Sequence, residues 1–128
     1  MNDLRSIPAY LMRGGTSKGL VFHEKDLPND RNLLTEYLLK IMGSPDIRQI
    51  NGIGGGTSVT SKVCIISKSL EKNLDIDYFF AQVEVDRKHV DYAPTCGNML
   101  SALGPFAIEE GLVETRNEIT QVLSLIHI

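Results

Sequence analysis

The chain has 128 residues, of which 42% are hydrophobic and 23% charged, and its formal net charge is −3. This length suits one domain with a real core, because domains commonly run ~100 to 150 residues, and a second complete domain does not fit. The 13 Lys and Arg residues are scattered and outnumbered by 16 acidic ones, which argues against a nucleic-acid partner. With no apolar run of ~18 residues and no secretory signal, no membrane association is predicted and the default location is cytoplasmic.

The first half of the chain predicts two strands and a helix. Residues 7–12 and 19–23 are strand candidates, separated by the glycine- and hydroxyl-rich turn RGGTSK. Apolar residues recur at helical spacing in RNLLTEYLLKIMG, residues 31–43, which predicts an amphipathic helix. Asp30 or the Asn before it is expected to cap the start of this helix, and Gly43 to end it.

The second half predicts further strands and a buried helix. A glycine-rich loop, NGIGGGTSVTS, leads into a β-branched strand at 62–67, and another strand is expected at 77–85. The segment CGNMLSALGPFAIEEGLV is apolar on nearly every side, and such a helix is normally buried all round. Pro105 is expected to kink it or to begin a new turn. The pattern predicts an α+β fold in which a sheet or barrel curls around this helix.

Cys96 stands at the predicted start of that helix. The positive end of the helix dipole favours a thiolate there, and the N–H groups of Gly97, Asn98 and Met99 form a ready site for a carboxylate. The residues alone are equally consistent with a small buried side chain that acts as a weak cap. Cys64, in the middle of a strand, is predicted to pack in the core. Both cysteines are expected to be free thiols in a reducing compartment.

The glycine-rich loop invites a phosphate-binding interpretation that its spacing does not support. Neither GGTSKGL nor GGGTSVTSK fits the P-loop pattern, and Thr57 stands where the dinucleotide pattern needs its third glycine. The loop can cradle a carboxylate or merely join two strands. Lys62 follows it at a strand end, where it is either solvated or, if partly buried, a base near neutrality. The histidines share no metal-ligand spacing, so no metal site is predicted.

Three long motifs in order carry a family resemblance. They are YLMRGGTSKGLVF, GSPDIRQINGIGGGTSVTSKV and PTCGNMLSALGPFAIEEGLV, and the similarity runs from about Ile7 to Val113. They resemble the methylaconitate isomerase family of PrpF-like proteins. The resemblance implies a diaminopimelate epimerase-like fold, in which two similar domains each form a curled, mostly antiparallel, barrel-like sheet around a central apolar helix. The active site would lie in the cleft between the domains.

The resemblance also implies an activity and a set of residues. Members of the family interconvert double-bond isomers of small unsaturated di- and tricarboxylates, such as 2-methylaconitate, aconitate or 4-oxalomesaconate, without a metal or organic cofactor. Their catalytic pair corresponds to Lys62 and Cys96, which would remove a proton and return one at another carbon. From their loop positions and the family similarity, six further residues are expected to contact substrate carboxylates: Thr16, Ser17, Gly55, Gly56, Gly97 and Asn98.

Members of this family are much longer than the present chain, so residues 1–122 are interpreted as an N-terminal, partial first domain without the second. The apolar tail QVLSLIHI is atypical, and residues 123–128 are interpreted as a truncation artefact. A lone domain is expected to expose apolar surface and to be inactive, while a homo-oligomer of the full-length protein stays open. The alternatives are a non-catalytic carboxylate-binding or interaction module and, against the spacing of the glycine motifs, a nucleotide-binding fragment.

Overall fold

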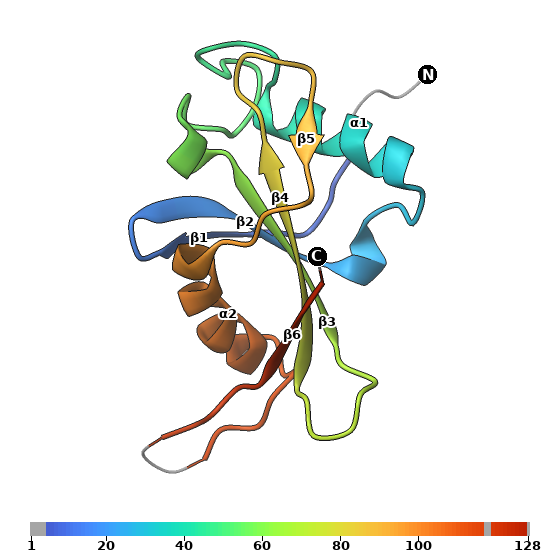
Figure 1. Cartoon of the computed structure of the whole chain (residues 1–128), viewed down its shortest axis with the longest axis vertical. Coiled ribbons are helices and arrows are strands. Elements are labelled where there is room, and N and C mark those ends of the chain that lie inside the picture. Colours follow the sequence, from blue (N-terminus) through green and yellow to red (C-terminus); the bar gives the residue numbers. More distant parts are fainter. Residues whose placement is uncertain (1–4, 117–118, 128) are drawn as a thin grey trace.

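A mixed sheet with one helix on each face makes up the structure, a computed structural model that describes residues 5–116 and 119–127 (Figure 1). The helices are α1 (Arg31–Met42) and α2 (Gly97–Glu109), with short 3-10 turns η1 (Glu24–Asp26) and η2 (Ser58–Thr60). The strands are β1 (Tyr10–Gly14), β2 (Ser17–His23), β3 (Lys62–Lys68), β4 (Ile76–Val83), β5 (Val90–Asp91) and β6 (Ser124–His127).

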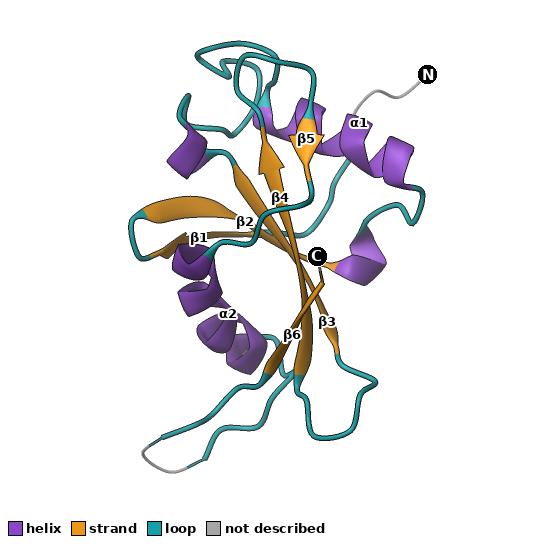
Figure 2. Ribbon diagram, in the orientation of Figure 1, coloured by secondary structure: helices purple, strands orange, loops and turns teal. Residues whose placement is uncertain are grey.

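The strands follow the order β1-β2-β3-β4-β5, and β6 also pairs with β4 (Figure 2). Three neighbouring pairs are antiparallel, namely β1 with β2, β3 with β4 and β4 with β5. The pairs β2–β3 and β4–β6 are parallel. The strands β5 and β6 pair with opposite ends of β4, so both are joined to the rest of the sheet through β4.

Strand alternation divides the core into two apolar layers, since successive side chains of a strand point to opposite faces. One layer packs against α1 and includes Leu34, Leu38, Leu39 and Met42 of that helix. The other packs against α2 and includes these buried residues: Val21, Cys64, Ile66, Ile76, Tyr78, Phe80, Cys96, Met99, Leu103, Phe106 and Ala107. The prediction that Cys64 packs in the core is confirmed, because its side chain is fully buried.

The ends of α1 confirm the sequence prediction. The side chain of Asp30 accepts a hydrogen bond from the Asn32 N–H at 2.8 Å, which satisfies one of the unpaired donors of the first turn. Gly43 ends the helix in the left-handed region with φ 89°, where a glycine carries no Cβ penalty. The predicted strands are also present, with ends that differ by a few residues.

The sheet and α2 differ from the barrel-like arrangement that the sequence predicts. Within the described residues the sheet is open, because β1 pairs only with β2 and does not meet β6. As a result, strands cover α2 from one side only. Ser101 and Pro105 are exposed, and Leu100 and Ile108 are partly exposed, so the helix is not buried all round. The helix also continues across Pro105.

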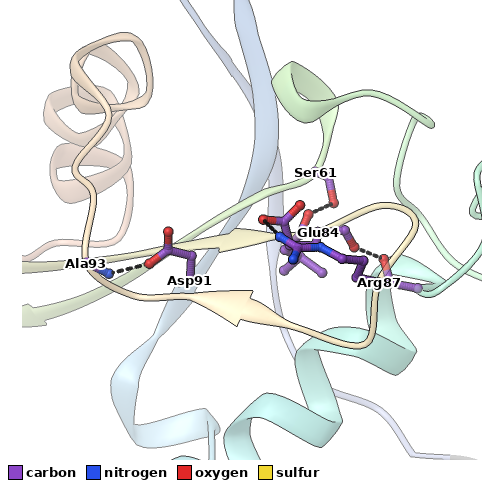
Figure 3. Close-up of polar contacts among 7 residues, drawn as sticks. Ser61, Glu84, Arg87, Asp91 and Ala93 are labelled. Atoms are coloured by element: carbon purple, nitrogen blue, oxygen red, sulfur yellow. Dashed lines mark hydrogen bonds and ion pairs between the residues drawn. The ribbon is translucent and has the colours of Figure 1, made fainter.

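Polar contacts hold the connection from β4 to β5 and the start of the segment that leads to α2 (Figure 3). Arg87 forms an ion pair with Glu84 at 3.0 Å, and the Glu84 N–H donates to the His89 carbonyl at 3.0 Å. Beyond β5, the Ala93 N–H donates to the Asp91 carboxylate at 2.9 Å. These contacts restrain the backbone on both sides of β5, before the chain continues to α2.

The atypical apolar tail contributes β6, which pairs with Ile76 to Phe79 of β4. The interpretation of residues 123–128 as an artefact, and of residues 1–122 as a partial domain, stays a prediction. Among the described residues, no helix is long and apolar enough to cross a membrane.

Candidate active site

One row of register partners crosses five strands and has Lys62 at its centre. The row consists of Met12, Gly19, Lys62, Gln82 and Asp91. A Cβ atom added to Gly19 would lie 3.1 Å from the Cβ atom of Lys62 and would overlap the Lys62 carbonyl oxygen. Glycine at this position therefore leaves space for the stem of the lysine.

The Lys62 ammonium group lies between an amide and an aromatic ring. Its Nζ donates a hydrogen bond to Oε1 of Gln82 at 2.9 Å and lies 5.2 Å from the centroid of the Phe80 ring. The lysine is partly buried, which excludes the fully solvated alternative left open by the sequence. A ring face at this distance attracts a cation. The Gln82 amide and the Phe80 ring are both uncharged, so they restrain the side chain without forming an ion pair with it.

Cys96 is the N-cap residue of α2, as the sequence predicted. Its Sγ accepts a hydrogen bond from the Met99 N–H at 3.4 Å, and the residue is 8% exposed. The Met99 donor is therefore engaged, whereas the N–H groups of Gly97 and Asn98 have no partner among the described residues. Gly97 and Asn98 are both exposed, so two donors at the positive end of the helix face outward beside the thiol.

Cys64 and Tyr78 form the floor of this region. Burial raises the pKa of the Cys64 thiol to about 12, and this outweighs the side-chain interaction with Tyr78 and the charge of Lys62, which lower it. Cys64 lies two residues after Lys62 on the same face of β3, and it belongs to the same buried cluster as Cys96. The Tyr78 hydroxyl also donates to the Cys96 carbonyl at 3.4 Å, which connects the sheet to the start of α2.

The hairpin between β1 and β2 packs against the start of α2. The Asn98 side-chain amide donates to the Thr16 hydroxyl at 3.0 Å. A Cβ atom on Gly14 would overlap the Asn98 carbonyl oxygen, so glycine permits this close approach. Ser17 is 1% exposed, and its hydroxyl has no hydrogen-bond partner among the described residues. The structure thus brings Thr16, Ser17 and Asn98 to the same corner as Cys96.

Gly55 and Gly56 are committed to the internal structure of the glycine-rich loop. The Gly56 N–H donates to Oε1 of Gln49 at 2.8 Å, and the Gly55 N–H donates to the Thr60 carbonyl at 3.1 Å. Gln49 is 1% exposed and has φ 48°, an uncommon conformation for a residue other than glycine. Its Nε2 donates to the Ser61 hydroxyl at 2.8 Å, which fixes the loop against the start of β3.

The loop glycines thus have structural reasons to be glycine. A Cβ atom on Gly54 would overlap the Gln49 side-chain amide, and one on Gly55 would lie 2.5 Å from the Thr60 hydroxyl. Contact between Gly55 or Gly56 and a substrate stays a prediction. Among residues 5–116 and 119–127, no three His, Cys, Asp or Glu side chains gather in a way that could hold a metal ion.

Comparison with known proteins identifies the family. Residues 4–126 match the family model described as PrpF protein. The chain belongs to the PrpF family. This agrees with the order of the glycine-rich loop, Lys62 and Cys96 in the sequence and confirms the resemblance carried by its motifs.

Relatives of this PrpF-family chain include named isomerases and a tautomerase. It is 55% identical over 116 residues to the 4-oxalomesaconate tautomerase of Pseudomonas putida, covering 91% of this chain and 32% of that protein. It is 46% identical over 114 residues to the 2-methyl-aconitate isomerase of Cupriavidus necator, covering 84% and 29%. The relatives are thus named as isomerases of unsaturated carboxylates. The chain spans about a third of the length of the curated relatives it matches.

A solved structure shares the fold. The crystal structure of methylitaconate-delta-isomerase superposes with a TM-score of 0.92 at 44% sequence identity, over 94% of this chain and 31% of that one. The α+β class predicted from the sequence is therefore confirmed. This PrpF-family chain therefore shares its fold with the matching region of that isomerase.

Sequence reasoning missed three residues of this PrpF-family site. Gln82 contacts Lys62, Tyr78 contacts Cys96, and Gln49 organises the glycine-rich loop. Strand alternation offered one usable signal, because Tyr78 and Gln82 fall on the same face of the strand expected at 77–85. The register that places Gln82 beside Lys62 depends on the pairing of β3 with β4, which no local pattern specifies.

Proposed function

We propose that this chain is part of an isomerase that moves a double bond in small unsaturated di- or tricarboxylates of the 2-methylaconitate, aconitate or 4-oxalomesaconate type. The observation that supports the proposal is that Lys62 precedes Cys64 by two residues on one face of β3, and that Cys64 and Cys96 belong to the same buried cluster beneath α2. Membership of the PrpF family supports it. The term full-length enzyme denotes a polypeptide of the relatives' length that contains this chain.

The chemistry requires one group that removes a proton and one that returns a proton. A base takes a proton from a carbon activated by a neighbouring carboxylate, which leaves a delocalised, enolate-like anion, and an acid then protonates a different carbon. The Lys62 amine and the Cys96 thiol can fill these roles in either order. The outward N–H groups at the start of α2 would stabilise the negative charge of the intermediate. The proposed reaction uses neither a metal nor an organic cofactor.

Substrate carboxylates are proposed to bind at the corner where the β1–β2 hairpin meets α2. Gly97 and Asn98 supply N–H donors that have no partner within the described part of the chain, and Thr16 and Ser17 supply hydroxyl groups from the hairpin. Gly55 and Gly56 are proposed to border the substrate on the opposite side of Lys62. Because their N–H groups already donate within the loop, they would act through shape more than through hydrogen bonds.

The remainder of the proposal concerns the fold of the full-length enzyme. We propose a diaminopimelate epimerase-like arrangement in which this chain supplies part of the first of two domains. The exposed side of α2, with Ser101 and Pro105, would then be covered by strands that lie beyond the present chain. In this arrangement the 128-residue chain alone has an incomplete cleft and is expected to be inactive.

The activity is tested by proton NMR of the full-length enzyme in deuterated water with a panel of unsaturated di- and tricarboxylates. The expected result is isomerisation of at least one compound, with deuterium entering at the carbon that is protonated. Binding of a carboxylate without exchange would instead favour a non-catalytic carboxylate-binding module. The absence of both would overturn the proposal.

The residue assignment is tested by Cys96→Ser and Lys62→Met in the same enzyme. Each is expected to lower kcat by about 10²- to 10⁴-fold, because a positioned acid or base commonly contributes that much. Lys68→Met is the matched control, since Lys68 is an exposed lysine at the other end of β3 and its loss should leave kcat unchanged. Near-normal rates in both site variants would contradict the assignment.

A further inference from the structure

Gln82 connects the Lys62 ammonium group to the end of the glycine-rich loop. Its Oε1 accepts from Lys62 Nζ at 2.9 Å, while its Nε2 donates to the Ser58 carbonyl at 2.9 Å and to the Ser61 carbonyl at 3.1 Å. Because carbonyl oxygens only accept hydrogen bonds, the amide nitrogen must face Ser58 and Ser61. The amide oxygen is thereby left pointing at the lysine, so the loop determines the orientation of the group that holds Lys62.

The contacts described for the Lys62 ammonium group are with uncharged groups, the Gln82 amide and the Phe80 ring. Asp91 lies beyond Gln82 in the same row, and its carboxylate accepts a hydrogen bond from the Ala93 N–H. Phe80 lies against its Nζ, and the nearby Cys64 thiol keeps its proton because burial raises its pKa to about 12. None of the ion pairs among the described residues involves Lys62. A carboxylate at position 82 would place an opposite charge beside the ammonium, whereas an amide fixes the position of the nitrogen without adding a charge.

We propose that Gln82 is a positioning residue that aims the Lys62 amine and couples it to the glycine-rich loop. The proposal rests on the proposed function, in which Lys62 exchanges protons with the substrate. A residue in this role needs an acceptor that is strong enough to hold the amine and uncharged, so that the amine can cycle between its protonated and neutral forms. The side-chain amide of glutamine meets both requirements, and its two donors fix it to the loop.

The positioning role is tested first in the 128-residue chain by NMR relaxation of the lysine ε-methylene groups. In the wild-type chain, Lys62 is expected to be clearly more restrained than the exposed Lys68 of the same strand, and Gln82→Met should bring its mobility to the Lys68 level. Equal mobility of the two lysines in the wild-type chain would overturn the proposal without any variant having to fold.

The charge requirement is tested by Gln82→Glu in the same chain. NMR titration of the Lys62 ε-methylene should show its proton leaving at a pH about one unit higher than in the wild-type chain, because an opposite charge within hydrogen-bond distance favours the ammonium. Gln121→Glu is the matched control, since it adds the same charge in an exposed segment. No shift in Gln82→Glu, or an equal shift in the control, would overturn the proposal.

Kinetics of the full-length enzyme separate this proposal from the proposed function. Gln82→Met should lower kcat by about tenfold or more with KM changed less than about threefold, and Gln82→Glu should move the Lys62-dependent limb of the pH–rate profile to higher pH. If Lys62→Met is inactive while Gln82→Met keeps full kcat, only the positioning role is wrong. If Lys62→Met is fully active, Lys62 exchanges no proton with the substrate and the positioning role fails with that assignment, whereas the proposed function fails only if the wild-type enzyme neither isomerises nor binds any compound of the panel.

Discussion

The segment from Gly52 to Cys64 and the segment from Cys96 to Asn98 both combine glycine with a cysteine. In the first, the N–H groups of Gly55 and Gly56 donate inside the loop and the thiol is fully buried. In the second, a Cβ atom on Gly97 would meet nothing within 4 Å, and the N–H groups of Gly97 and Asn98 have no partner among the described residues. The difference teaches that the same residue types can serve packing in one segment and leave groups available for a ligand in another.

The largest expected effect comes from Gly52→Ala, which tests the packing side of this comparison. A Cβ atom at this position would overlap the backbone nitrogen of Gly43, and backbone cannot move aside as a flexible side chain does. The free energy of unfolding of the 128-residue chain should fall by about 3 kcal/mol, measured by urea denaturation. A loss below about 0.5 kcal/mol would mean that the loop is not packed as described.

Alkylation kinetics compare the two thiols directly. In the native chain at pH 8, iodoacetamide should modify Cys96 at least about 100-fold faster than Cys64, because only the thiolate reacts and the buried thiol keeps its proton. Mass spectrometry of the labelled chain gives the ratio. In 8 M urea, as an internal control, both residues should react at similar rates. Equal rates in the native chain would contradict the assignment of Cys64 to the core.

Alkaline destabilisation tests the burial of Cys64 thermodynamically. The folded-state pKa of about 12 lies above the ordinary thiol value of about 9, so the unfolded chain loses this proton first as the pH rises. The stabilisation is complete below pH 9 and is lost towards pH 12, with a slope of at most about 1.4 kcal/mol per pH unit. Urea unfolding between pH 8 and 11 measures it. Cys64→Ala should flatten the slope, and an unchanged slope would refute the explanation.

The smallest expected effect on stability belongs to Gly97→Ala, the matched partner of Gly52→Ala. Neither glycine has a positive φ, so the two substitutions differ mainly in the space around the new methyl group. The change in unfolding free energy should stay within about 0.5 kcal/mol. In the full-length enzyme KM should rise about tenfold, because the methyl group obstructs a carboxylate approaching the helix N–H groups. An unchanged KM would place the carboxylate elsewhere.

Local patterns predicted the parts of the fold whose causes are local. Asp30 and Gly43 mark the ends of α1, and Cys96 marks the start of α2, because capping involves residues only a few positions apart. The open sheet was not predictable in this way, since closure depends on which distant strands meet. An apolar helix indicates that several of its sides can be covered, and does not show that this chain covers them.

The same distinction between local and tertiary causes applies to the candidate site. Lys62 and Cys96 emerged from motifs, whereas the role of Gln82 depends on the register of β3 with β4. The engagement of Gly56 depends on Gln49, which must adopt φ 48° to place its amide in the loop. Such contacts join residues whose pairing is set by tertiary structure, and a glycine pattern alone cannot distinguish an occupied N–H group from a free one.

The row that contains Lys62 also sets the spacing of the proposed catalytic pair. Its last member, Asp91, ends β5, and only residues 92–95 separate it from Cys96, the cap of α2. Lys62 and Cys96 are thus distant along the chain, yet a rigid sheet and one short segment determine how far apart they lie. A single residue inserted within 92–95 would change the distance between Lys62 and Cys96 while leaving both side chains chemically intact.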